Sequence, residues 1–187
     1  MRITLHVVHT DDYTAFHEAM LRNLRASRLH DNRFKVTGLS IAEADALVPP
    51  LVELTSQPRT QAEIEELLTE RLGGPPHRGV WWALRTFAPL VHAPTGGTWS
   101  FGPRSTFLAA PTTPERVDPS QALPRLLRRY LEGFGPASGA DFGQFALQRV
   151  PAVREALDAL AGELTVLEGP EGTELFDVRG ARDSASR

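Results

Sequence analysis

The chain has 187 residues, 41% of them hydrophobic, so it is long enough to bury a core in one large or two small domains. It contains no cysteine, which excludes disulfides, thiolate catalysis and cysteine-built zinc sites and fits the reducing cytoplasm. The net charge of -3 argues against binding by overall positive charge, although 19 of the 20 Lys and Arg residues are arginines, whose forked donors suit phosphates and guanine edges.

No apolar run is long enough for a membrane span, and the N-terminus has no basic stretch followed by an apolar one, as secretory signals have. We therefore expect a cytoplasmic protein with no membrane partner. If it binds DNA, we expect it at the nucleoid.

Residues 1–37 predict a strand followed by a helix. The stretch "RITLHVVHT" alternates as a strand does, and Thr10 with the two aspartates after it suits a helix start. The helix is expected to run to about Ser27. Its core face would carry Tyr13, Phe16, Met20 and Leu24. A chain that begins in mid-strand lacks the partners of that strand, so we expect self-association through its exposed edge.

Residues 38–110 predict helices followed by a hairpin. Two capping boxes, Ser40 with Glu43 and Thr60 with Glu63, each begin a helix. Pro49 and Pro50 are expected to bend or end the first helix, and Gly73 and Gly74 to end the second. After Pro75 and Pro76 comes another helix, and then "LVHAP", a Thr95-Gly96-Gly97 turn and "TWSFG" form the hairpin. Helix, tight turn, helix and hairpin is the winged-helix order.

Residues 111–178 repeat that order. A helix from about Pro119 to Glu132 has Arg125, Arg128 and Arg129 on a solvated face, and Ser138 caps a short helix before the helix in "VPAVREALDAL". The closing "ELTVLEGPEGTELFDV" predicts two strands around a turn, and the tail at 179–187 is expected to be disordered.

These segments predict an α+β fold, predominantly helical, with tandem winged helix-turn-helix units and short β-hairpin wings. Residues 38–110 and 111–178 would each be one unit. Residues 1–37 would be the remnant of a first unit, made of a wing strand and a helix.

The helix from Arg78 to Ala88 is the candidate recognition helix. At about 100° per residue its inner arc is apolar, and its outer arc carries Arg78, Trp82, Arg85 and Thr86. Such a face can enter the major groove of DNA, and His77 at the entrance can contact phosphate or cap the helix. The alternative is that Trp82 is buried and that the arginines pair with acidic residues. These are Glu65, Glu66 and Glu70. For Trp81 and Trp99 we expect packing in the core or the wing.

A second basic surface is predicted in "RNLRASRLHDNRFK", residues 22–35, where five basic residues face one aspartate. Its candidate phosphate contacts are Arg22, Arg25 and Arg28.

No residue pattern in the sequence predicts a catalytic, metal-binding or cofactor-binding site. The sequence has no HExxH motif and no acidic cluster at ligand spacing, so we expect no metal site. It also lacks GxSxG, GxxxxGK[ST] and a GxGxxG that opens a helix after a strand, so no cofactor and no catalytic residue is predicted.

Three stretches resemble one known family. They are "ITLHVVHTDDY", "WWALRTFAPLVHAPTGGTWSFG" and "RRYLEGFGPASGADFGQFA" with the following "VREALDALAGEL". Together they are similar to the winged-helix DNA-binding proteins of the AlkZ/YcaQ DNA glycosylase family, of the type found in high-GC actinobacteria. The resemblance runs from about Ile3 to Val178. It implies tandem winged helices that embrace double-stranded DNA, and some members excise alkylated or crosslinked bases.

The family uses a glutamine–hydrophobic–glutamine (or aspartate) motif before the strand that matches "ITLHVV". The glutamines of this sequence, at 57, 61, 121, 144 and 148, nowhere occur two apart. The resemblance therefore implies a chain truncated at both ends, which binds DNA without excising bases because the side chains of the reacting segment are missing. Two alternatives stay open. One is an active glycosylase completed by a partner chain, and the other is a winged-helix module that binds protein.

Overall fold

The computed structural model describes residues 7–74, 78–97, 99–102, 104–111 and 118–180. The chain forms two compact units: unit 1 comprises residues 1–23 and 113–187, and unit 2 comprises residues 24–112. Helix α1 (Thr10–Leu29) contributes to both. The predicted segment 1–37 is therefore divided, because the last turns of α1 pack with the chain that follows them.

The helices of unit 2 begin and end where local signals place them. They are α2 (Asn32–Lys35), α3 (Ile41–Ala46), α4 (Val48–Leu54), α5 (Gln61–Leu72) and α6 (Arg78–Phe87). Both predicted capping boxes are confirmed. Pro49 and Pro50 lie in the first turn of α4, so the expected single helix is two helices that meet at Leu47. Gly73 ends α5 in the left-handed conformation, with φ 68°.

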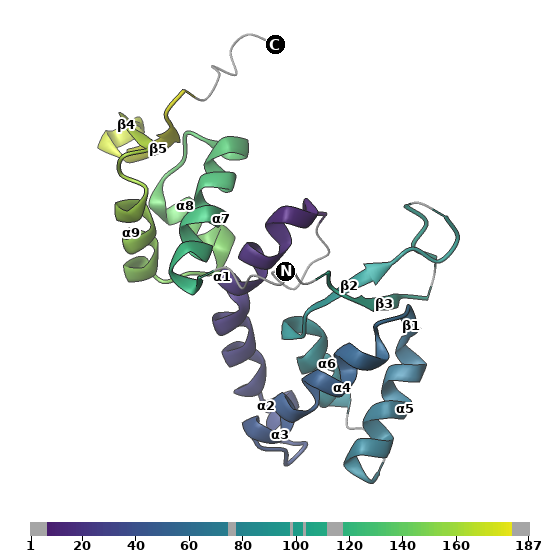
Figure 1. Cartoon of the computed structure of the whole chain (residues 1–187). Coiled ribbons are helices and arrows are strands. Elements are labelled where there is room, and N and C mark those ends of the chain that lie inside the picture. The colour runs from purple at the N-terminus through teal and green to yellow at the C-terminus, as the bar shows by residue number, and fades with distance from the viewer. Residues whose placement is uncertain (1–6, 75–77, 98, 103, 112–117, 181–187) are drawn as a thin grey trace. The chain divides into compact units, whose positions relative to one another are not determined.

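Unit 2 also holds a three-stranded antiparallel sheet in the order β1-β3-β2 (Figure 1). Its strands are β1 (Arg59–Thr60), β2 (Leu90–Ala93) and β3 (Thr106–Ala109). In the register of the hairpin, Leu90 lies opposite Ala109 and Ala93 opposite Thr106.

The predicted second strand "TWSFG" is wrong, because the returning strand lies further along the chain. Trp99 has φ 66°, in the left-handed region, and the Ser100 amide donates to the Gly97 carbonyl, so this segment turns. Trp99 does not pack in the core, because the residue is 67% exposed; it lies in the loop between β2 and β3.

The core of unit 2 lies between α2, α4, α5 and α6 and the sheet. Its fully buried side chains include Phe34, Leu51, Ile64, Leu68, Val80 and Leu84. Close packing of α6 on α2 requires a glycine, because a Cβ added at Gly79 would collide with the backbone carbonyl of Arg33.

Unit 1 packs the first part of α1 with three helices and a hairpin, which follow one another in Figure 1. The elements are α7 (Pro119–Phe134), α8 (Gly139–Ala146), α9 (Val150–Ala159), β4 (Leu164–Glu168), the 3-10 turn η1 (Pro170–Gly172) and β5 (Glu174–Val178). The predicted Ser138 cap is confirmed, and so is the closing hairpin, whose strands pair antiparallel from Leu164 with Val178 to Glu168 with Glu174. Phe142 and Leu127 lie at the centre of this core.

The fold is α+β and mostly helical, as predicted. Most of the predicted first strand, at residues 1–6, lies outside the described residues, and the regular structure begins at Thr10. Residues 181–187 of the predicted tail lie outside them too. Within the described part of the chain, every helix is too short or too polar to cross a membrane.

Candidate nucleic-acid interface

Helix α6 has the two faces that its sequence predicts. Val80, Ala83, Leu84 and Phe87 are buried, whereas Arg78 and Arg85 are exposed. Trp82 lies between these extremes, partly exposed. The helix therefore presents two guanidinium groups and part of an indole ring on its outer side.

Trp82 is surrounded by arginines. The guanidinium carbons of Arg28 and Arg33 lie over its ring, at 4.2 and 4.4 Å from the ring centroid. A cation over an indole face gains about 0.5–1 kcal/mol at an exposed site and more when water is excluded. The absent side chain at Gly79 brings α2, and Arg33 with it, close enough to α6 for this contact.

Arg28 is the best-buried cation of this group, at 8% exposure. Its Nε donates to the hydroxyl of Thr86 at 3.1 Å, and that hydroxyl donates to the Trp82 carbonyl at 3.2 Å. Burial and the positive charges of Arg33 and Arg85 lower the pKa of Arg28, against the opposing effect of Asp31. Like charges held together raise the positive potential around α6, which attracts an anion.

Trp81, the neighbour of Trp82, points inward and is 4% exposed, which confirms the expected packing. Its ring meets Phe107 of β3 edge to face, with centroids 5.0 Å apart. The indole Nε1 is buried and, among the described residues, has no hydrogen-bond acceptor. A buried donor without a partner costs about 1–3 kcal/mol, so this atom needs an explanation.

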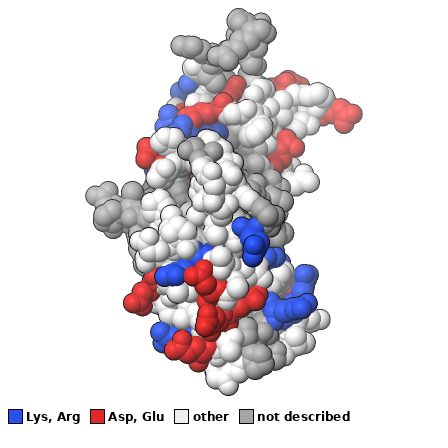
Figure 2. All heavy atoms as spheres, turned by 90° about the vertical axis from the view of Figure 1, so that its right-hand side faces the viewer, with Lys and Arg blue, Asp and Glu red and all other residues white. Residues whose placement is uncertain are grey.

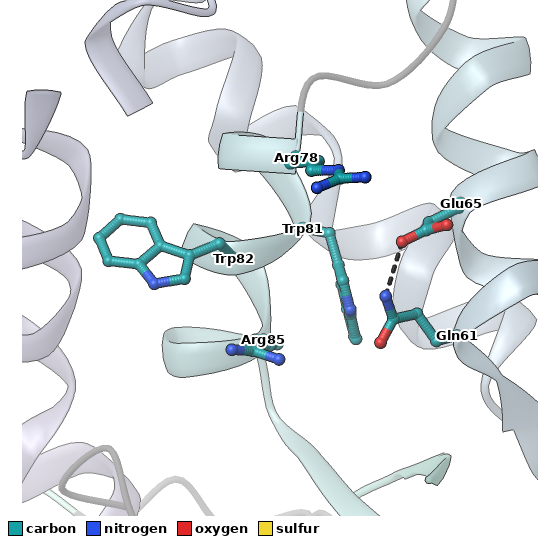
Figure 3. Close-up of a pocket in the computed structure, with 6 residues that line it drawn as sticks. All are labelled: Gln61, Glu65, Arg78, Trp81, Trp82 and Arg85. Carbon is teal, nitrogen blue, oxygen red and sulfur yellow. Dashed lines mark hydrogen bonds between the residues drawn. The ribbon is translucent and has the colours of Figure 1, made fainter. Parts of the chain in front are cut away.

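A hollow of about 420 Å³ lies beside this tryptophan, between α5 and α6. It is lined by Gln61, Glu65, Arg78, Trp81, Trp82 and Arg85. The amide nitrogen of Gln61 donates to Glu65 Oε1 at 2.7 Å, and Figure 3 shows this pair across from the Trp81 ring. The volume lies in the range of small-ligand pockets.

The arginines of α6 are not neutralised by the helix beside them. Within the part of the chain that the structure describes, neither Arg78 nor Arg85 forms an ion pair with Glu65, Glu66 or Glu70. On the face shown in Figure 2, acidic side chains gather low in the view, where α5 carries these glutamates. The surface of unit 2 therefore carries both signs of charge, with exposed Arg78 and Arg85 on α6 near the glutamates of α5.

The other candidate residues lie in different settings. Arg22 is exposed on α1 in the part that belongs to unit 1, and Arg25 binds Asp45 through two hydrogen bonds in unit 2. Arg28 is engaged with Thr86 and Trp82. His77 lies outside the described residues.

Two residues of this site, Arg33 and Gln61, were not singled out from the sequence, and Glu65 was named only as a partner for the arginines. Arg33 belonged to the basic stretch, but only its distance from Trp82 shows its role. Gln61 and Glu65 are one helical turn apart on α5, so a pairing between them was foreseeable, whereas their position against Trp81 was not. Among the described residues, no group of three His, Cys, Asp or Glu side chains could hold a metal ion.

Residues 1–187 match the sequence model of a family described as DNA glycosylase AlkZ-like. Among solved structures, the chain is similar to Streptomyces sahachiroi DNA glycosylase AlkZ, with 22% identity and a TM-score of 0.72. The likeness covers 96% of this chain and 51% of that one, so this chain spans about half the length of the solved protein. No curated protein matches the chain. At this identity, the structural likeness shows a common fold.

Proposed function

Because the chain belongs to the AlkZ-like DNA glycosylase family, we propose that it binds double-stranded DNA through α6 and the arginines around Trp82. Arg78, Trp82 and Arg85 would meet the major groove, and Arg33 would reach the phosphates beside it. The observation that carries this proposal is the exposure of Arg78 and Arg85 without carboxylate partners among the described residues.

We also propose that unit 2 is a winged helix. In support, its elements follow the order β1, α5, α6, β2, β3, and its sheet has the order β1-β3-β2. In this arrangement α6 is the second helix of the helix-turn-helix, and the loop between β2 and β3 is the wing. The same interpretation of residues 111–178 stays a prediction.

A salt titration tests DNA binding directly. We expect the affinity for a duplex of about 20 base pairs to fall steeply between roughly 50 and 200 mM salt, since bound arginines displace counterions. Arg85→Ala is expected to weaken binding about 3- to 10-fold and to reduce the salt slope by about 1. Arg154→Ala is the matched control, because Arg154 is an exposed arginine on α9. Affinity without salt dependence, or an equal loss in both variants, would refute the proposed surface.

We propose further that this 187-residue chain does not excise bases by itself. The paired glutamines that the family resemblance implies are absent from the printed sequence, and no described cluster offers an alternative set. A duplex carrying N7-methylguanine should therefore release free base no faster with the chain than in buffer. Faster release would refute this proposal, and release only after addition of a second chain would support an enzyme completed by a partner.

One observation favours a protein-binding module instead. Helix α5 has four glutamates, at 63, 65, 66 and 70, and the whole chain has a net charge of -3. A basic protein partner would suit that surface. In that case the salt titration would show no DNA affinity at the lowest salt.

A further inference from the structure

The hollow beside α6 has walls of opposite hydrogen-bonding character. Arg78, Arg85 and the indole N–H of Trp81 can only donate, whereas Glu65 can only accept when ionised. Gln61 already donates to Glu65, which leaves its own carbonyl oxygen as a further acceptor. A ligand that satisfies both walls must carry donors and acceptors close together on one edge.

The unpartnered donor is fixed in place. The Trp81 ring is held edge to face against Phe107, at 5.0 Å between centroids, so Nε1 cannot turn away to find an acceptor. Figure 3 shows the Gln61 amide beside this ring with its nitrogen directed to Glu65. Both residues line the hollow, so a ligand acceptor that took the place of the Gln61 amide would lie beside the Trp81 ring.

The remaining lining selects a flat and electron-rich ligand. The exposed guanidinium groups of Arg78 and Arg85 suit phosphate, and a planar guanidinium can also stack on a flat ring, whereas the Trp82 ring is already covered by Arg28 and Arg33. About 420 Å³ accommodates one aromatic heterocycle, and a base pair within a duplex would not enter it.

We propose that this hollow takes one unpaired nucleobase of a bound DNA strand. Glu65 accepts a hydrogen bond from the exocyclic amine of the base, and the Trp81 N–H donates to an acceptor on the ring. The phosphates on either side of the base lie on Arg78 and Arg85. This inference rests on the proposed DNA binding and adds to it the form of DNA that is preferred.

The charge of Glu65 predicts which base fits. Cytosine carries an exocyclic amine that donates, whereas thymine carries an oxygen at the same position. The two bases have nearly the same size, so a preference between them reports hydrogen bonding and not volume.

Three duplexes of the same flanking sequence test the proposal. One is fully paired, one has a single bulged cytosine, and one has a single bulged thymine. We expect the cytosine bulge to bind about tenfold more tightly than the paired duplex, with the thymine bulge between them. Equal affinity for the bulged and paired duplexes would overturn the inference.

Two variants of α5 that remove the same charge provide the matched comparison. Glu65→Gln is expected to abolish the preference for cytosine over thymine, because an amide also donates. Glu66→Gln is the control, since Glu66 is exposed and does not line the hollow. Loss of the preference in both variants, or in neither, would contradict the role given to Glu65.

The indole N–H provides a direct readout. The Nε1 proton resonance that is missing from Trp81→Phe belongs to Trp81, and it should shift when the cytosine bulge is added to the unsubstituted chain. No shift at saturation would overturn the inference, whether or not the variant is stable. If the paired duplex binds with a steep salt dependence but the bulges add nothing, the inference fails and the proposed function stands. If no duplex binds at low salt, both fail.

Discussion

Two groups of arginines, one on α7 of unit 1 and one around α6 of unit 2, have different partners. In unit 1, Arg125 and Arg129 on α7 bind the carboxylate of Asp12 at 2.9 and 3.1 Å, and Asp12 is buried. In unit 2, Arg28 and Arg33 lie against an indole ring, although Arg33 also binds Asp31 at 3.2 Å, and Arg78 and Arg85 face solvent.

The pKa values record the same contrast. Burial acts to raise the pKa of Asp12, but the hydrogen bonds and positive charges of Arg125 and Arg129 outweigh it and lower the pKa. Arg28 has no such carboxylate, so burial and its arginine neighbours lower its pKa. The arginines of α7 therefore find a carboxylate within unit 1, whereas Arg78 and Arg85 on α6 are left for a ligand.

The largest expected effect comes from breaking the internal pairing of unit 1. Asp12→Asn leaves two guanidinium groups without their shared carboxylate. Because both arginines are nearly half exposed, we expect a loss of about 2 kcal/mol in the free energy of unfolding, below the full cost of a buried pair. Urea unfolding at pH 7 measures this loss. Asp11→Asn, at an exposed neighbouring residue, is the control and is expected to change the free energy of unfolding little. A similar loss in this variant would show that any acidic residue in the first turn of α1 stabilises the fold, and that the ion pairs of Asp12 have no special role.

A smaller effect is expected from separating α6 from α2 in unit 2. Gly79→Ala places a methyl group against the carbonyl of Arg33, so α6 must shift. We expect a loss of about 1–2 kcal/mol in unfolding free energy and weaker DNA binding, since Arg33 moves off Trp82. Gly133→Ala in α7 is the control, because an added Cβ there meets nothing, and it should stabilise by roughly 0.5 kcal/mol. If Gly79→Ala binds DNA as tightly as the unsubstituted chain, the contact between Arg33 and Trp82 does not contribute to DNA binding.

The smallest expected effect is a change of stability with pH, in which His92 of unit 2 and Asp12 of unit 1 act in different pH ranges. Burial and the positive charge of Arg85 lower the pKa of His92 in β2 below 6.5, the ordinary value for histidine. The unfolded chain therefore takes up this proton first, and stability that is present above pH 6.5 is lost as the pH falls toward the folded pKa. We expect less than about 1 kcal/mol, since the ring is partly solvated.

For Asp12 the window lies lower. Its stabilisation is present above the unfolded pKa of 3.8 and is lost as the pH falls through the lowered folded value. The free energy of unfolding, measured between about pH 7 and 5, should therefore fall with the pH in the unsubstituted chain. It should stay more nearly constant in His92→Gln. An identical pH profile for the two chains would show that His92 does not contribute.

Much of the local structure could be predicted because it depends on residues close together in the sequence. Ser40 with Glu43 and Thr60 with Glu63 form their capping boxes within one turn. The apolar arc of α6 follows from its 3.6-residue period, and so does the outward position of Arg78 and Arg85.

Pairings between distant residues had no comparable signal. Nothing near Leu90 indicates that its partner is Ala109, and the glycines at 96 and 97 pointed to an earlier return of the chain. Asp12 reads as a helix-start acid, which it is, but its ion pairs reach across 113 residues to Arg125.

The sequence by itself determined that this chain has short capped helices, an arginine-bearing outer face on α6 and a likeness to a DNA glycosylase family, because each depends on spacing along the chain. Only the tertiary structure decided which arginines meet carboxylates and which meet Trp82, and that Trp81 keeps a buried donor without an acceptor among the described residues. The physical reason is that charge pairing and desolvation depend on distances between segments, which folding sets and local sequence patterns do not encode.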